Sequence, residues 1–298
     1  MTSLPDKVKK YYIKPYDELY TYIDSKLRKT TIPVPPRLRR DKTAQLKNIL
    51  LGKLAIAYNI VDKELEKIIN IVEEIEKSNP FYVEIYRMIT GTEPGITAKK
   101  LRIARRNLRR IYYEYRVNIK NSYSGKEASG HFKAGLGRIL SFYRRNDQLI
   151  QAIKKVVVEI AKLPDISGDL MVIIAGMPQV GKSTIIRSLT NAEPEIGNYP
   201  FTTKNIIEGH ITVKHLGKIT LIDTPGLLDR PQSMRNEIEN KAILAIKHLA
   251  DKAVYVFDPS PQSYYTLNEQ LRVYREVEEL VGSENTVSYT HLTLPTKA

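Results

Sequence analysis

One short run of residues constrains the fold of this chain more than any other feature. Residues 176–183 read Gly-Met-Pro-Gln-Val-Gly-Lys-Ser, which matches the spacing G-x-x-x-x-G-K-[ST]. A loop of this pattern joins a buried strand to a helix and directs backbone N–H groups, together with the positive end of the helix, at phosphate oxygens. The pattern therefore predicts an α/β domain with a phosphate-binding loop, although an ordinary glycine-rich turn is the alternative.

The residues around the loop favour the phosphate-binding interpretation. Residues 171–175 form a short continuous apolar run, which is typical of a buried parallel strand. Residues 184–189 can open a helix, and residues 218–222 form a second strand that delivers Asp223 at its carboxyl end. Open α/β sheets bind ligands at that end of their strands.

Two side chains of the loop have expected roles. Lys182 reaches the β- and γ-phosphates in loops of this type, and the hydroxyl of Ser183 binds Mg²⁺. The predicted phosphate contacts come from the whole loop and the start of its helix, namely Gly176, Met177, Pro178, Gln179, Val180, Gly181, Lys182, Ser183 and Thr184.

A polar segment between the loop and Asp223 offers further oxygen ligands. Mg²⁺ prefers six oxygen ligands in an octahedron, and Thr202 and Thr203 supply hydroxyl groups. Alone, they would read as two threonines at a strand edge. With the motifs on either side, the order of loop, threonine and Asp-x-x-Gly resembles the P-loop GTPases. That resemblance implies that Asp223 acts on Mg²⁺ through water and that the Gly226 N–H meets the γ-phosphate.

The resemblance narrows when the motifs are combined. The runs Tyr-Pro-Phe-Thr-Thr at 199–203 and Asp-Thr-Pro-Gly-Leu at 223–227 are similar to those of Obg-related GTPases, in which the second threonine binds the metal. Thr203 is therefore the implied metal ligand. The helical region, from Asn-Pro-Phe-Tyr at 79–82 to Tyr-Arg-Arg at 143–145, resembles the Nog type of nucleolar GTP-binding proteins in its archaeal form.

This family resemblance covers nearly all of residues 1–282 and implies GTP hydrolysis, with GTP or GDP and Mg²⁺ as cofactors, coupled to assembly of the large ribosomal subunit. The implied catalytic residues are Lys182, Thr203 and Gly226. The additional nucleotide-contact residues are Phe201, Thr202, Thr203, Asp223, Thr224, Pro225 and Gly226.

Two positions depart from the pattern. Gln179 stands where relatives have an asparagine that helps to hold a monovalent cation in some GTPases, so potassium dependence is not expected. Leu227 follows the Asp-x-x-Gly motif, where Ras-like enzymes have a glutamine that orients the attacking water. Leucine cannot hydrogen-bond to water, so we expect slow intrinsic hydrolysis and an activating partner.

The last residues do not fit the rest of the domain. The guanine-reading motif Asn/Thr-Lys-x-Asp should follow soon after residue 282, and the sequence lacks it. Residues 283–298 have neither helical period nor a long apolar run, so we predict a non-native or disordered tail; a genuine divergent tail is the alternative. We accordingly expect a truncated GTPase domain at 166–282 that ends in an exposed strand and discriminates poorly between bases.

Composition separates two domains and limits the function classes. The 298 residues include no cysteine, which excludes disulfides, Fe–S clusters and thiolate zinc sites. The amino terminus lacks a signal peptide's apolar core and no 18-residue apolar run occurs, so we expect a cytoplasmic protein without a membrane partner. Residues 1–170 carry 34 Lys and Arg against 19 Asp and Glu, whereas the remainder carries 13 and 14. This asymmetry predicts a polyanionic partner, for which ribosomal RNA is the family's implication.

The basic part, residues 1–165, has helical periodicity throughout and predicts a helical bundle. We expect helices at residues 7–28, from 41 or 43 to about 78 with a break near 59–62, at 97–117, and at 125–163 with a bend at Gly130, Gly135 and Gly137. Arginines crowd the helix at 97–117 and have few acidic neighbours one turn away, which destabilises them unless an anion is present. The RNA-contact candidates are Arg37, Arg39, Arg40, Arg102, Arg105, Arg106, Arg109 and Arg110; a merely solvated face is the alternative.

Two function hypotheses remain open at this point. The first is a Mg²⁺-dependent GTPase that docks on ribosomal RNA through its basic bundle. The second is an RNA- or ribosome-binding assembly module that holds nucleotide structurally with negligible turnover. Two tyrosine pairs, Tyr11 with Tyr12 and Tyr112 with Tyr113, could stack on RNA bases, but core packing with the hydroxyl at the surface is favoured over stacking.

Overall fold

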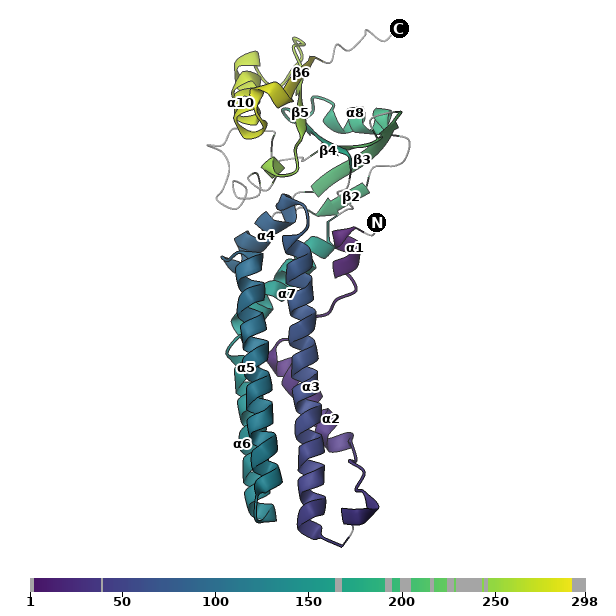
Figure 1. The fold of residues 1–298 in the computed structure, drawn as a ribbon. Helices are drawn as coiled ribbons and strands as arrows, with labels where there is room; N and C mark the ends of the chain where they lie inside the picture. The colour runs from purple at the N-terminus through teal and green to yellow at the C-terminus, as the bar shows by residue number, and fades with distance from the viewer. Residues whose placement is uncertain are drawn as a thin grey trace. The chain divides into compact units, whose positions relative to one another are not determined.

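The computed structural model describes residues 3–38, 40–163, 168–190, 195–198, 205–214, 217–223, 228, 243 and 246–290. The chain divides into two compact units. We call Tyr11–Lys77 with Ile89–Val156 the helical unit, and Met1–Lys10, Ser78–Met88 and Val157–Ala298 the sheet unit. These bounds differ in detail from a boundary at residue 165, which stays a prediction. The elements are labelled in Figure 1.

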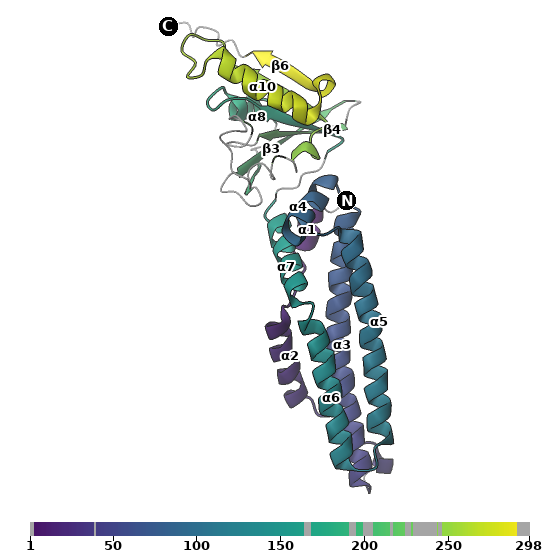
Figure 2. The ribbon, with the colours of Figure 1, turned by 90° about the vertical axis from the view of Figure 1, so that its left-hand side faces the viewer.

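Three long helices form the centre of the helical unit. They are α3 (Lys42–Glu76), α5 (Pro94–Asn121) and α6 (Gly125–Arg144), which pack on one another in all three pairs and run side by side in both ribbon views (Figures 1 and 2). The shorter α2 (Tyr16–Lys29), the 3₁₀ turn η1 (Pro36–Leu38) and most of α7 (Asp147–Ala161) complete it. Apolar side chains at helical spacing are buried between the helices, among them Leu65, Leu101 and Ile139.

The predicted break near residues 59–62 does not occur, because α3 is continuous over Lys42–Glu76. Its buried stripe runs through Ala57, Val61 and Leu65 without a proline or glycine to interrupt the helix. Asp41 caps the amino end of α3, as the sequence suggested, since its carboxylate accepts hydrogen bonds from the backbone of Thr43 and Ala44.

The predicted bend at the glycines of 125–163 is also wrong. The helix α6 continues through Gly130, Gly135 and Gly137, and the chain instead breaks after Arg144, before α7 begins. Gly135 is used for close packing: a Cβ atom there would lie 2.7 Å from the ring of Tyr115 on α5. Its missing side chain therefore lets α5 and α6 approach each other.

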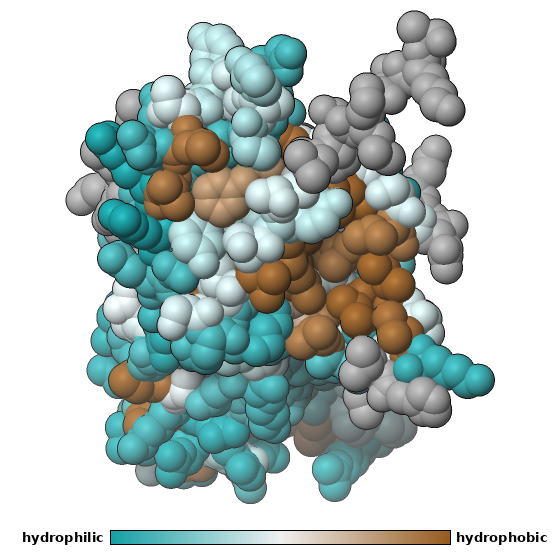
Figure 3. Space-filling view, turned by 90° about the horizontal axis from the view of Figure 1, so that it is seen from above, coloured by the Kyte–Doolittle hydropathy of each residue, from teal (hydrophilic) through white to brown (hydrophobic). Residues whose placement is uncertain are grey.

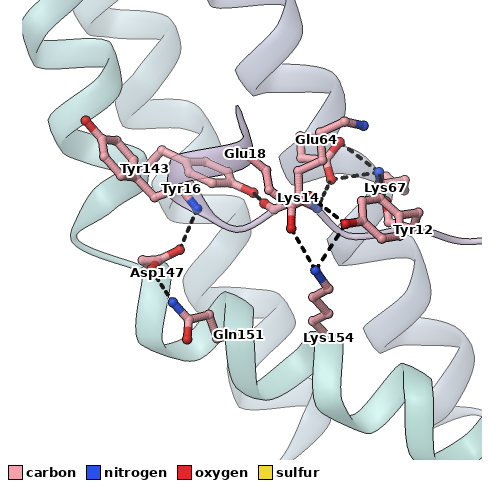
Figure 4. Close-up of polar contacts among 10 residues, drawn as sticks. All are labelled: Tyr12, Lys14, Tyr16, Glu18, Glu64, Lys67, Tyr143, Asp147, Gln151 and Lys154. Carbon is pink, nitrogen blue, oxygen red and sulfur yellow. Dashed lines mark hydrogen bonds and ion pairs between the residues drawn. The ribbon is translucent and has the colours of Figure 1, made fainter. Parts of the chain in front are cut away.

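The single helix predicted at residues 7–28 is divided in the structure. A short α1 (Leu4–Val8) ends before Pro15, and α2 begins directly after it, since proline disfavours helical backbone at the residue before it. Backbone groups of the extended segment between α1 and α2 form hydrogen bonds with side chains of α3 and α6, as Figure 4 shows. The Lys14 N–H donates to Glu64 at 2.9 Å, and the Tyr143 hydroxyl donates to the Lys14 carbonyl at 2.7 Å.

The sheet unit contains a six-stranded sheet in the order β2-β3-β4-β1-β5-β6. The strands are β1 (Leu170–Ala175), β2 (Glu195–Asn198), β3 (Asn205–Val213), β4 (Gly217–Asp223), β5 (Lys252–Phe257) and β6 (Thr286–Thr290). The four strands β4, β1, β5 and β6 are parallel, whereas β3 is antiparallel to both β2 and β4. The predicted α/β fold with a mostly parallel sheet, preceded by an all-α region, is thus confirmed.

Helices α8 (Lys182–Leu189) and α10 (Leu267–Val281) connect strands in the described part of the sheet unit. The helix α8 follows β1, and α10 lies between β5 and β6 in the chain. The helix α4 (Pro80–Thr90) belongs largely to the same unit. Thr266 and Glu269 form a reciprocal capping box at the start of α10, with Glu269 accepting from the Thr266 N–H at 2.8 Å. This cap fixes where α10 begins.

Residues 283–298 were predicted to be a non-native or disordered tail, but the structure shows regular elements at residues 283–290. A 3₁₀ turn, η3 (Ser283–Asn285), leads into β6, which pairs with β5 from Ala253↔Thr286 to Phe257↔Thr290. The edge of β5 presents backbone N–H and C=O groups that need hydrogen-bond partners. The strand β6 provides these partners although its sequence lacks an apolar run. Residues 291–298 lie outside the described residues.

Among the residues that the structure describes, no helix is both long enough and apolar enough to cross a membrane.

Candidate nucleotide-binding site and basic surface

The phosphate loop, residues 176–183, begins where β1 ends at Ala175 and is shaped by close approach of the chain to β5. A Cβ atom at Gly176 would lie 2.7 Å from the carbonyl oxygen of Val256, and its φ of 148° is one that side chains rarely adopt. Only glycine fits there without moving the neighbouring backbone. The first glycine of the motif is thus a packing requirement of this sheet.

Two later residues of the loop adopt left-handed backbone. Gly181 has a φ of 92° and caps the start of α8, while Gln179 has a φ of 68°. Gln179 is the one non-glycine residue with positive φ in the part of the chain that the structure describes. Such a conformation costs energy for a side chain with a Cβ and is usually retained for function.

Lys182 is folded into the loop that precedes it. Its Nζ donates to the carbonyl oxygens of Gly176 at 2.9 Å and Met177 at 2.8 Å, and only 8% of the residue is exposed. The ammonium group therefore lies inside the curve of the phosphate loop, at the amino end of α8. A cation in this position adds to the positive end of the helix dipole, and both favour a bound anion.

Ser183 and Asp223 come together from separate elements. Ser183 lies in the first turn of α8 and donates its hydroxyl to Asp223 Oδ2 at 2.7 Å, and Asp223 is fully buried at the end of β4. The parallel register places Asp223 opposite Ile174 of β1, next to the loop. A hydroxyl and a carboxylate oxygen at this distance are hard donors of the kind that Mg²⁺ prefers, so the pair fits that metal.

A hollow of about 600 Å³ adjoins the loop on one face of the sheet. Val172, Ile174 and Val254 lie along its wall on the strands, and Ile185 and Leu189 line it from α8. Figure 3 shows apolar surface gathered on the sheet unit. Apolar walls do not bind phosphate, which must be held by the loop itself.

Several predicted site residues lie outside the described residues. They are Phe201, Thr202, Thr203, Thr224, Pro225 and Gly226, together with Leu227. Their predicted roles in binding metal and γ-phosphate stay predictions. The structure brings together the other half of the site, namely the phosphate loop and Asp223.

The loop that follows β5 was not anticipated from the sequence. Gln270 of α10 is fully buried and donates through Nε2 to the carbonyl oxygens of Asp258 and Tyr265, while the Asp258 N–H donates to its Oε1. Asp258 and Ser260 also line the hollow beside the phosphate loop. A lone glutamine on a helix carries no sequence signal for this role.

The arginines of α5 are divided by what they contact. Arg105 forms a bidentate pair with Asp62 of α3 at 2.7 and 2.8 Å and also contacts Glu66 at 3.0 Å. The hydrogen bond to Asp62 raises the pKa of the Arg105 guanidinium above its usual range. Arg102 pairs with Glu73 at 2.5 Å. These acidic partners lie on the neighbouring helix, so the spacing of charges within α5 alone could not reveal them.

The remaining candidates are exposed. Within the described chain, no ion pair joins an acidic side chain to Arg106, Arg109 or Arg110. Arg37 and Arg40 are exposed at or next to η1, and Arg39 lies outside the described residues. Contact of these residues with RNA stays a prediction.

Two family models match the chain. One, described as the NOG1 N-terminal helical domain, covers residues 17–167, which is about half of the chain. The other, described as a 50S ribosome-binding GTPase, covers residues 171–287, which include the phosphate loop, Asp223 and the start of β6.

Two similar curated proteins match most of the length of this chain. An uncharacterised protein of Methanocaldococcus jannaschii is 32% identical over 81% of this chain and 68% of its own length. Nucleolar GTP-binding protein 1 of Drosophila melanogaster is 29% identical over 87% of this chain but only 40% of its own length. A solved nucleolar GTP-binding protein 1 from Plasmodium falciparum is 30% identical over 43% of this chain and 62% of that one, with a TM-score of 0.36.

Proposed function

Because this chain belongs to the NOG1 family of GTP-binding proteins, we propose that it is a Mg²⁺-dependent GTPase that acts as a nucleotide switch in assembly of the large ribosomal subunit. In this proposal the basic helical unit docks on ribosomal RNA, and GTP hydrolysis releases or resets the complex. The chain spans 40% of the Drosophila relative, so the activity and partners of the whole protein belong to the proposal.

The observation that carries the proposal is the junction of β1, β4 and α8. Lys182, Ser183 and Asp223 converge there at the phosphate loop, and Ser183 lies 2.7 Å from Asp223. Binding of a triphosphate and its metal requires a cation, a hydroxyl and a carboxylate together at the carboxyl ends of parallel strands. An ordinary turn or a structural ion pair does not require this arrangement.

Each of these residues has a proposed task. Lys182 exchanges its two loop carbonyl partners for phosphate oxygens and so stabilises negative charge that develops during hydrolysis. Ser183 and Thr203 would hold Mg²⁺ through their hydroxyl groups, and Asp223 would hold it through water. When bound, Mg²⁺ neutralises charge on the β- and γ-phosphates. The Gly226 N–H senses the γ-phosphate.

We propose that hydrolysis is slow without a partner. Leu227 provides no hydrogen bond for the attacking water, so a group from the ribosomal particle or from a protein partner must position it. The same residue favours a second candidate function, in which the chain is a ribosome-binding assembly module whose nucleotide is a structural ligand.

Phosphate release under multiple-turnover conditions separates the two candidates. We expect slow GTP turnover by the purified protein, faster turnover when large ribosomal subunits are added, and neither in Lys182→Ala. Turnover that stays negligible with subunits, while GTP still binds, would support the structural role. Rapid turnover by the protein alone would contradict the role given to Leu227.

A further inference from the structure

The outer face of α5 carries a row of basic residues with one aromatic ring in its middle. A helix turns 100° per residue, so residues seven apart lie almost in line along its surface. Arg106, Tyr113 and Lys120 have this spacing, and all three are exposed. Arg109, Arg110 and Arg116 are exposed beside them. We call this set, Arg106, Arg109, Arg110, Tyr113, Arg116 and Lys120, the basic stripe; Figure 2 shows α5 along one edge of the helical bundle.

The two adjacent tyrosines of α5 have different surroundings. Tyr112 turns inward and stacks on Tyr58 of α3, with ring centroids 4.3 Å apart and planes 13° from parallel. Tyr113 points outward and is 44% exposed. Tyr112 also meets the ring of Tyr113 edge-on at 5.3 Å. The outer ring is thereby supported by a tyrosine that is itself fixed in the bundle.

Two arginines flank the exposed ring. The guanidinium carbons of Arg109 and Arg116 lie 5.7 and 6.0 Å from the centroid of Tyr113. These distances are within the range of cation–π attraction. Because the guanidinium groups lie over the ring, a stacking base exchanges with them at the ring surface, and both cations remain near the phosphates next to that base.

The neighbouring groove limits where a polyanion can lie. A groove of about 640 Å³ runs between α3 and α5, and its lining includes the carboxylates of Asp62, Glu66 and Glu73 together with Arg106 and Arg109 of the basic stripe. Phosphate is repelled by these carboxylates. Arg106 and Arg109 both line this groove and belong to the exposed stripe, so they can contact phosphates that avoid the carboxylates and follow the stripe past Tyr113.

We propose that Tyr113 is a stacking platform for an unpaired RNA base, with Arg106, Arg109 and Arg116 contacting the phosphates next to that base. This inference rests on the proposed RNA-binding function and specifies its ligand as single-stranded RNA. Bases in an intact duplex are stacked on one another, so their faces are not available to a side chain, whereas unpaired bases can be turned onto an aromatic ring.

Fluorescence anisotropy with two labelled RNAs tests the proposal. The probes are a short unstructured oligonucleotide and a blunt duplex of the same length, titrated with the full chain at low salt. We expect Tyr113→Leu to weaken binding of the single strand by about tenfold and to leave duplex binding unchanged, since one stacked base contributes on this scale. Tyr113→Phe should keep the affinity because it keeps the ring.

A matched control removes another exposed tyrosine. Tyr123, which is 97% exposed just after the end of α5, should tolerate replacement by leucine without loss of binding to either RNA. Single-strand affinity that is unchanged in Tyr113→Leu, or an equal loss for both RNAs, would overturn the stacking platform while leaving RNA binding in place. Failure of the unaltered chain to bind either RNA would instead overturn the proposed RNA-binding function and the platform with it. Circular dichroism confirms that each variant is folded.

Discussion

Gln179 in the phosphate loop has a strained backbone conformation. Its φ of 68° lies in the left-handed region, which asparagine tolerates better than other residues with a side chain. We predict that Gln179→Asn leaves the free energy of unfolding unchanged or raises it slightly, whereas the β-branched Gln179→Val lowers it by about 1 kcal/mol. Chemical denaturation of both variants measures the difference. Equal stability of the two would show that the left-handed turn is not retained in solution.

At this scale the sequence predicted the strand, loop and helix around residues 176–183, because the glycines and the lysine have fixed physical tasks there, while the phosphate contacts stay predictions. Gly176 must pass close to Val256, and Lys182 must reach into the curve of the loop. The strained backbone at Gln179 could not be predicted, since glutamine gives no sign of positive φ. The partners of Gln270 were equally invisible, because hydrogen bonds to backbone carbonyls do not depend on the identity of the residue that supplies them.

Ion pairs join α3 and α5 in the helical unit. Arg105 reaches Asp62 and Glu66 across the helix interface, and about a third of its side chain is exposed. We predict that Arg105→Gln lowers the free energy of unfolding by about 1 kcal/mol, because the bidentate contact is lost in a partly solvated setting. Arg106→Gln is the matched control and should change it by less than about 0.5 kcal/mol. Similar losses in both would show that the cross-helix pair contributes nothing specific.

Tyr143 of α6, which donates to the backbone of the segment before α2, makes the stability of the helical unit depend on alkaline pH. Burial, together with the negative charges of Glu64 and Asp147, raises the pKa of the Tyr143 hydroxyl above its ordinary value of 10.0. The unfolded chain can ionise this tyrosine above that pH, while the folded chain keeps the proton. The contribution of the protonated Tyr143 to the free energy of unfolding is therefore fully present below about pH 10 and is lost as pH rises further.

Tyr143→Phe tests this linkage. The variant loses the hydrogen bond to the Lys14 carbonyl, so it should be less stable by about 1 kcal/mol near neutral pH. Above pH 10 the difference between the variant and the unaltered chain should shrink, because phenylalanine has no proton to lose. Tyr123→Phe, at an exposed position, serves as the control. A difference that stays constant with pH would contradict the buried role of the hydroxyl.

Elements were predicted well where period and turn chemistry agreed, as in α5 and the strands β1 and β4. Errors arose where a local signal competed with packing. Gly135 suggested a bend but lets α5 approach α6, and the polar run at 286–290 suggested a tail but pairs with the edge of β5. Both outcomes depend on a neighbour that is distant in sequence.

The whole chain has an uneven distribution of charge that predicts the salt dependence of RNA binding. The excess of positive charge lies before residue 171, and the basic stripe concentrates part of it on one helix face. If about four phosphates are neutralised, log Kd for single-stranded RNA should change with log salt with a slope of about 3. Affinity should therefore fall roughly 50-fold between about 50 and 200 mM salt.

Arg106→Gln should lower that slope by about 0.7, which is one phosphate contact. Arg102→Gln should change it less, because Arg102 is paired with Glu73. Anisotropy titrations at several salt concentrations give both slopes. A slope near zero for the unaltered chain would contradict binding through phosphate contacts.

Nucleotide binding by the phosphate loop is the claim on which the proposed function depends. Isothermal titration calorimetry of the chain with GTP and Mg²⁺ tests it most directly, with Lys182→Ala as the variant. We predict saturable binding by the unaltered chain and a loss of at least about 30-fold in affinity in the variant, since Lys182 is the buried cation of the loop. Binding that Lys182→Ala leaves unchanged, or no uptake of GTP by the unaltered chain, would contradict the proposed function.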